Sequence, residues 1–174
     1  MIKKLLLSPF TPHRIFSTST SFQLHEVIAI AILNLIIYTI GYQINGQIIV
    51  PNYGVFSVNQ AVLFGFGALF SQAIVAFCIY FLLMRTGWGT CSHLEAFAMV
   101  LFTALPSWVL LFLETSLLEL YWTWWLIAIL WRIGIIATAL HKWKGLTVTR
   151  SIVVITVSLV LIALFSVHSV GIRI

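Results

Sequence analysis

The stretch QAVLFGFGALFSQAIVAFCIYFLLM, residues 60–84, decides the fold, because it runs for 25 residues without a charged side chain. An α-helix rises about 1.5 Å per residue, so a helix of this length exceeds the thickness of a bilayer's hydrocarbon core. Shortly beyond it, Thr86-Gly87-Trp88-Gly89 contains the glycines that mark a helix end. Residues 60–84 are therefore predicted to span a membrane.

The composition of the whole chain agrees with this prediction. Of its 174 residues, 61% are hydrophobic and only 7% are charged, whereas about a quarter of a soluble domain is charged. Five spans of roughly 20 residues would use about 100 residues and leave no room for a second, soluble domain. The predicted fold class is all-α, a polytopic transmembrane helical bundle of about five spans.

Four further apolar segments are predicted to span the membrane, one before residues 60–84 and three after them. The predicted spans are residues 27–42, 60–84, 93–113, 121–140 and 150–170, and Pro106 falls inside the third. We divide the chain into a cytoplasmic or interfacial N-terminal segment, residues 1–24, and a five-helix transmembrane domain, residues 25–172. Pro9 and Pro12 interrupt any long helix in the first segment, which we expect to lie on the lipid headgroups.

The distribution of positive charge predicts the topology, because positive residues resist translocation. Seven lysines and arginines fall on one side of the predicted spans, whereas the other side has Arg173 with Glu114 and Glu119. The seven are Lys3, Lys4, Arg14, Arg85, Lys142, Lys144 and Arg150. We therefore expect a cytoplasmic N-terminus and a C-terminus outside the cell or in a lumen.

The same charges suggest a partner, the headgroups of membrane lipids. The candidate contact residues are Lys3, Lys4, Arg14, Lys142, Lys144 and Arg150. A purely topological role for these charges is the favoured alternative. Despite the net charge of +5, no nucleic acid partner is expected, since the basic residues flank apolar spans and form no continuous patch.

Arg132 is the one charge predicted inside a span. It lies nine residues from the cytoplasmic end of residues 121–140, about 13 Å deep at 1.5 Å per residue. An arginine at the bilayer centre costs roughly 3 kcal/mol on insertion scales, so it should have polar partners. Pro106 cannot donate a hydrogen bond to the carbonyl of Phe102, and Arg132 could replace that donor.

Several other polar residues fall at about the same depth. The predicted polar layer consists of Arg132, Asn34, Thr103, Ser158 and Pro106. Glu95 is shallower, although two long side chains could bring it to Arg132. Two roles are open for the layer: a brace between helices, or a site that binds or passes a solute. We favour the brace, because five helices with one arginine make a poor pathway.

No cofactor, metal site or catalytic group is predicted. The histidines on the predicted cytoplasmic side, with Glu26 and Glu95 beside two of them, have ligand chemistry, but those pairs do not share a helix face. These histidines are His13, His25, His93 and His141. Cys78 and Cys91 are expected to be free thiols. We expect the protein not to be an enzyme.

Gly67 and Ser71 have the spacing that allows a neighbouring helix to approach closely in a membrane. An equally weighted alternative is that they are simply small residues within a hydrophobic span.

Three stretches of the sequence resemble the Yip family, Rab-interacting membrane proteins of the early secretory pathway and their prokaryotic relatives. They are the glycine-rich turn of residues 86–92, the Leu-Pro of residues 104–106, and Gly134 followed by residues 146–151. The resemblance covers roughly residues 60–165 and implies five spans with the N-terminus inside. Arg150 and Ser151 stand where the family usually has Lys and Ala. The 24 residues before the first span are shorter than the GTPase-binding region of the eukaryotic members, which favours a prokaryotic form with no settled activity.

We therefore expect an integral, multi-pass membrane protein, in a prokaryotic plasma membrane rather than an ER, Golgi or organelle membrane. Its expected role is that of a Yip-like scaffold or accessory subunit, acting through membrane lipids and through other membrane proteins or self-association. The alternative is a small solute transporter or channel that uses the polar layer around Arg132.

Overall fold

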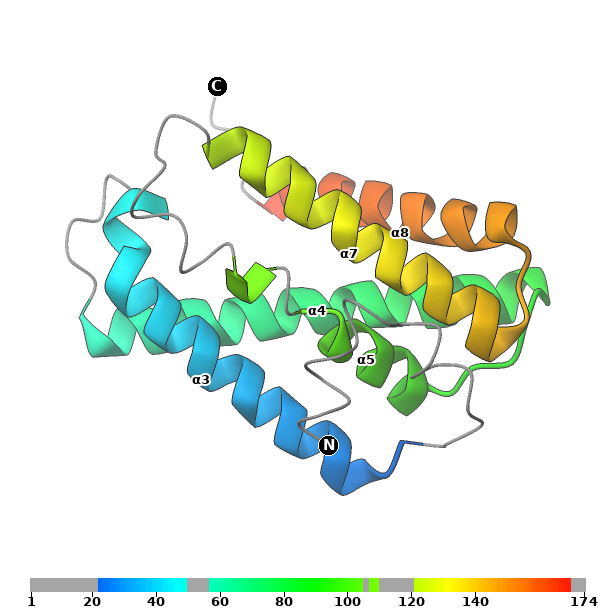
Figure 1. Ribbon diagram of the computed structural model, residues 1–174, viewed down its shortest axis with the longest axis horizontal. Coiled ribbons are helices and arrows are strands. Elements are labelled where there is room, and N and C mark those ends of the chain that lie inside the picture. The colour runs from blue at the N-terminus through cyan, green and yellow to red at the C-terminus, as the bar shows by residue number, and fades with distance from the viewer. Residues whose placement is uncertain (1–21, 50–56, 105–106, 110–120, 170–174) are drawn as a thin grey trace.

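The computed structural model describes residues 22–49, 57–104, 107–109 and 121–169, and their regular elements are all α-helices (Figure 1). The helices are α3 (Leu24–Ile49), α4 (Val58–Thr86), α5 (His93–Phe102), α7 (Tyr121–Lys144) and α8 (Val148–Ser169), with a short helical turn at residues 107–109. No strand occurs in these ranges. The predicted all-α fold class is confirmed.

Three of the described helices are long and apolar enough to cross a membrane. The qualifying segments are Leu24–Ile44 of α3, Val58–Thr86, which is all of α4, and Leu126–Lys144 of α7. Shorter apolar helices cover His93–Phe102 and Val148–Val160. The predicted membrane class is thus supported by three helices, and the stretch quoted first forms the longest of them.

Local sequence signals define the ends of α4 and the start of α5. In α4, the hydroxyl of Ser57 accepts the N–H of Gln60 at 3.3 Å, and the side chain of Gln60 accepts the N–H of Ser57 at 2.9 Å. Ser92 and Glu95 form the same reciprocal capping box at the start of α5. Gly87 ends α4 with a φ of +64°, a left-handed conformation that suits glycine.

The third predicted span is not one continuous helix, so this part of the prediction is wrong. α5 ends at Phe102, and the N–H groups of Thr103 and Ala104 bond three residues back, to the carbonyls of Val100 and Leu101. Residues 107–109 form a separate helical turn. Pro106 and residues 110–113 lie outside the described residues. A proline has no N–H and disfavours helical geometry in the residue before it, which explains the early end.

Burial distinguishes α5 from the longer helices. Residues 98–102 of α5 are each 1% exposed or less. In contrast, α4 has a row of large apolar side chains that are at least 45% exposed: Leu63, Phe66, Phe70, Phe77, Phe81 and Met84. A buried centre and an apolar outer surface are expected of a bundle whose solvent is lipid.

α3 and α4 are in close contact at Gly65. A Cβ at this position would lie 2.7 Å from Oγ1 of Thr39, so only glycine fits without a shift. Gly67, by contrast, has no atom within 4 Å of such a Cβ, and exposed Ser71 donates to the carbonyl of Ala68 at 2.8 Å. The predicted pair Gly67 and Ser71 therefore lies on the outer face of α4 and does not contact a neighbouring helix of the described chain.

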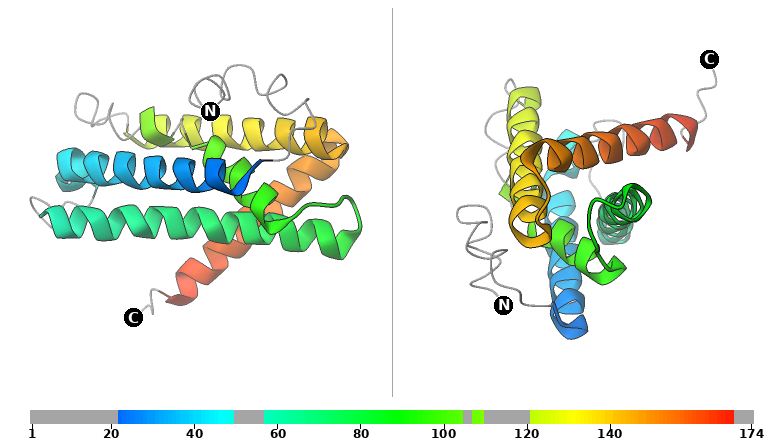
Figure 2. Two further views of the ribbon diagram at one scale, coloured as in Figure 1. Left: turned by 90° about the horizontal axis from the view of Figure 1, so that it is seen from below. Right: turned by 90° about the vertical axis from the view of Figure 1, so that its right-hand side faces the viewer.

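Four helix ends gather at one end of the molecule, on the right in Figure 1. These are the end of α4, the start of α5, the end of α7 and the start of α8, and we call this region the loop end. Arg85, Lys142, Lys144 and Arg150 all belong to it. From there α8 runs obliquely to α4, as the left view of Figure 2 shows.

Candidate functional site

Arg132 of α7 reaches the break that follows α5. Its Nη2 donates to the carbonyl of Val100 at 3.3 Å, and its Nη1 lies 3.5 Å from the hydroxyl of Ser107. The prediction that Arg132 would serve the carbonyl of Phe102 is wrong, since the acceptor lies two residues earlier. The last carbonyls of a helix lack i+4 donors, and the carbonyl of Val100 near the end of α5 instead accepts the N–H of Thr103 at 3.3 Å together with Arg132.

Asn34 of α3 holds the same break from another side. Its Oδ1 accepts the indole N–H of Trp108 at 3.1 Å, and its Nδ2 donates to the carbonyl of Ile30 at 2.9 Å. Asn34 is fully buried and Trp108 is 5% exposed. Arg132 and Asn34 thus hold two adjacent residues, Ser107 and Trp108, from two different helices.

We call Asn34, Val100, Ser107, Trp108 and Arg132 the polar brace. The sequence analysis identified Asn34 and Arg132, the residues of α3 and α7 that hold the break, but missed their partners Ser107 and Trp108. Their signal was available, because a buried indole N–H needs an acceptor and both residues directly follow the proline.

Thr103 and Ser158, the other predicted members of the polar layer, are fully buried but bonded within their own helical segments. The hydroxyl of Thr103 donates to the carbonyl of Val100 at 2.8 Å, and that of Ser158 donates to the carbonyl of Val154 at 2.7 Å. Thr103 therefore shares an acceptor with Arg132, whereas Ser158 has no recorded side-chain bond to the brace. Pro106 lies outside the described residues.

Gln72 of α4 is a buried polar residue that the sequence analysis missed. It is 2% exposed, and neither its Oε1 nor its Nε2 has a hydrogen-bond partner. Leaving a buried carboxamide unpaired costs about 1–3 kcal/mol. Gln72 is therefore a place where the bundle could accept a small polar molecule such as water.

At the loop end, Glu95 joins α5 to α7. Its Oε1 lies 2.8 Å from Nζ of Lys144, and its Oε2 accepts the N–H of Ser92 at 2.8 Å. One carboxylate thus caps α5 and forms an ion pair with the last residue of α7. The contact between Glu95 and Arg132 that the sequence analysis had allowed is therefore not formed.

Three of the four basic residues of the loop end face outward. Arg85, Lys142 and Arg150 are exposed, with the guanidinium of Arg150 5.4 Å from the centre of the Trp88 ring. Lys144 is an exception, since its side chain is 9% exposed and lies over Trp143 at 4.3 Å. Lys3, Lys4 and Arg14 lie outside the described residues. Three of the six predicted headgroup contacts are thus placed, and two of those, Lys142 and Arg150, are free to meet lipid.

Burial raises the pKa of the Cys91 thiol to about 11, despite the nearby positive charge of Lys144. Cys91 and Cys78 are both buried and both free thiols, as predicted. Within the described ranges, no three His, Cys, Asp or Glu side chains are grouped so that they could hold a metal ion. His13 lies outside those ranges.

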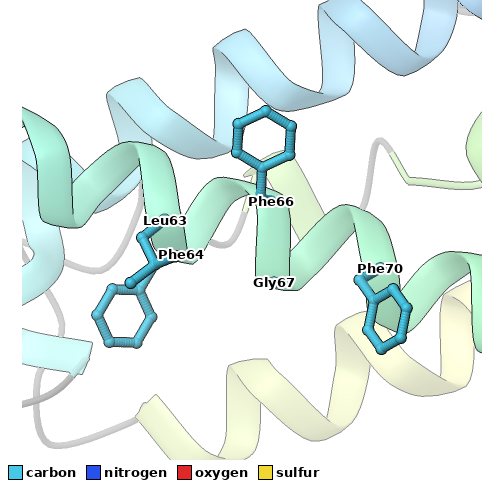
Figure 3. Close-up of a pocket in the computed structure, with 5 residues that line it drawn as sticks. All are labelled: Leu63, Phe64, Phe66, Gly67 and Phe70. Carbon is cyan, nitrogen blue, oxygen red and sulfur yellow. The ribbon is translucent and has the colours of Figure 1, made fainter.

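Two open hollows lie on the surface of α4. The first, of about 440 Å³, is lined by Leu63, Phe64, Phe66, Gly67 and Phe70, and Figure 3 shows the side chains projecting around Gly67. The second, of about 450 Å³, lies between α4 and α5 and is lined by Ala73, Ala76, Phe77, His93, Leu94 and Phe97. Both linings are almost wholly apolar, so they suit hydrocarbon or another apolar helix.

Comparison with known proteins adds no relative, because no family model, curated protein or solved structure matches this chain.

Proposed function

We propose that the chain is a five-span protein of a prokaryotic plasma membrane, with its N-terminus in the cytoplasm and its C-terminus outside. The three long apolar helices supply three of the spans, α5 with the segment after its break supplies another, and α8 is the last. The gathering of Arg85, Lys142, Lys144 and Arg150 at the loop end supports a cytoplasmic location for that end.

Within that membrane, the chain acts without catalysis as a Yip-like scaffold or accessory subunit that binds other membrane proteins. The observation that carries this proposal is the contrast between the centre and the surface. Polar side chains of the centre are used to brace α3, α5 and α7, whereas the outer face of α4 presents exposed phenylalanines around the small residue Gly67. Small residues on an outer face allow another helix to approach closely in lipid.

The test is to solubilise native membranes in mild detergent, crosslink, isolate the chain and identify the proteins that accompany it. Gly67→Leu fills the hollow and should remove a stoichiometric partner. Gly134→Leu is the matched control, since Gly134 is also an exposed helical glycine with no atom within 4 Å of a Cβ. A chain that is recovered alone, or a partner lost equally in both variants, contradicts the proposal.

The second candidate function is a small transporter or channel, which the unpaired carboxamide of Gln72 favours. Purified protein in liposomes should then pass a solute, and Arg132→Ala or Gln72→Leu should abolish that flux. Absence of flux over a broad panel of solutes rejects this candidate and leaves the scaffold in place.

A further inference from the structure

The hollow between α4 and α5 differs from the hollow at Gly67, because it combines an apolar floor with one polar ring. Ala73 and Ala76 of α4 are small and leave depth beside the larger Phe77 and Phe97. His93, the first residue of α5, is the polar member of the lining and marks the loop end of the hollow. Its remaining walls are hydrocarbon and run from His93 along α5 toward the centre of the bundle.

An aromatic row connects His93 to a positive charge. The ring of His93 is stacked on Phe77 at 6.3 Å and 8°, and Phe77 is stacked on Phe81 at 6.3 Å and 21°. The guanidinium of Arg85 lies 5.8 Å from the centre of the Phe81 ring. Tyr80 also contacts the His93 ring, with 3.6 Å between the ring centres. His93 and Arg85 thus flank the same two phenylalanines at the loop end.

Arg85 lacks a negative partner in the described part of the chain. The one ion pair recorded there joins Lys144 to Glu95, and the other oxygen of Glu95 is occupied by the N–H of Ser92. Arg85 is exposed and stands at the end of α4, one turn of helix beyond Phe81. Its charge is therefore open to an anion from outside the protein.

From these observations we propose that the hollow between α4 and α5 binds an anionic phospholipid. The phosphate binds Arg85, and one acyl chain runs past Phe81 and Phe77 into the space beside Ala73 and Ala76. This arrangement matches the order of the ligand, since charge lies at the loop end and hydrocarbon lies deeper. Basic residues at a membrane surface select anionic lipids in this way. The proposal rests on the membrane location of the chain, and it is independent of the scaffold role.

The experiment is native mass spectrometry of the full chain, extracted from nanodiscs that contain equal amounts of phosphatidylglycerol and phosphatidylcholine. The wild-type chain should retain phosphatidylglycerol preferentially. Arg85→Gln should reduce that preference at least about tenfold, the effect of losing one hydrogen bond to a charged group. Ala73→Leu, which fills the hollow without a change of charge, should abolish retention of both lipids.

Lys142→Gln is the matched control, because Lys142 is also an exposed cation of the loop end but belongs to α7 and not to the aromatic row that leads to the hollow. The control should reduce the preference no more than about fivefold, the value of one surface charge that makes no specific contact with the lipid. Equal losses in Arg85→Gln and Lys142→Gln would mean diffuse charge and would overturn the proposal. Full retention in Ala73→Leu would also overturn it.

Two further measurements separate this proposal from other outcomes. Thermal unfolding of each variant in detergent shows whether Ala73→Leu is folded, and Ala73→Val takes its place if it is not. Free glycerol 3-phosphate should not displace the bound lipid, because it lacks the acyl chain, and displacement would indicate a simple phosphate site. Failure of lipid retention leaves the crosslinking test of the scaffold role unaffected.

Discussion

α4 and α5 are neighbours in the chain and begin in the same way, but they differ in length and environment. Each starts with a serine and a reciprocal capping box, yet α4 continues for 29 residues and α5 for only 10. α4 presents exposed phenylalanines, whereas residues 98–102, the second half of α5, are completely buried. Apolar content alone therefore does not distinguish a helix that faces lipid from one that forms the core.

The difference also explains the polar brace. A long continuous helix satisfies its own backbone, so α4 needs caps only at its ends. α5 ends inside the bundle, where water is scarce, and the carbonyl of Val100 accepts bonds from Thr103 and from Arg132. The break in α5 is thus stabilised by side chains from other helices.

The largest predicted loss of stability is at Trp108, which follows α5, and it is compared with a substitution on the outer face of α4. Trp108→Ala should lower the free energy of unfolding by about 3–5 kcal/mol, because it removes a buried ring and the partner of Asn34. Phe70→Ala should change it by less than about 0.5 kcal/mol, since Phe70 is 68% exposed. Denaturation in mixed micelles measures both.

Trp108→Phe separates packing from hydrogen bonding in that comparison. It keeps most of the ring and loses the N–H, so it should cost about 1–2 kcal/mol. Equal effects at Trp108 and Phe70 would mean that the two helices do not differ in environment.

A smaller effect is expected from the brace itself. Arg132→Leu should lower the free energy of unfolding by about 1–2 kcal/mol, because Ser107 and Val100 each lose a hydrogen bond that links them to α7. Arg85→Leu is the control on α4 and should leave the thermal midpoint unchanged. An unchanged midpoint in Arg132→Leu would reject the role of Arg132 as a brace.

The role of Arg132 illustrates how far the sequence alone leads. Counting residues from the helix end placed Arg132 at the depth of the proline break, and the structure joins the two there. The specific acceptor was not predictable, because it depends on where α5 stops and on the tight turn at Thr103. In the same way, Gly87 predicted the end of α4 because a left-handed residue at a helix end favours glycine.

The faces of α4 were not predictable from its sequence. Gly65 and Gly67 are both small and lie within the same apolar span, but only Gly65 meets α3. The direction in which α3 crosses α4 decides this, and no local pattern in an all-apolar helix encodes that direction. Gln72 was missed for the same reason, since its burial depends on neighbours from other helices.

A further prediction compares the two capping boxes. Glu95→Ala should cost about 1–2 kcal/mol, because it removes both the cap of Ser92 and the ion pair with Lys144. Gln60→Ala should cost about 0.5–1 kcal/mol, since Gln60 only caps Ser57. Adding Lys144→Ala to Glu95→Ala should cause little further loss, and a large additional loss would show that Lys144 acts through another contact.

The last prediction tests whether the loop between α4 and α5 is buried like the core of α5 or exposed like the outer face of α4. Cys91 lies in this loop, is 6% exposed and has a thiol pKa raised to about 11 by burial, so it behaves as part of the α5 core. At pH 7 its thiolate fraction is about a hundredfold below that of a thiol at the ordinary value. Maleimide labelling of Cys78→Ala protein, in which Cys91 is the remaining thiol, should therefore be slow at pH 7. Because pH 9 is still below the raised pKa, the rate should rise about a hundredfold between pH 7 and pH 9. Fast labelling at pH 7 would instead place the loop in water with the outer face of α4.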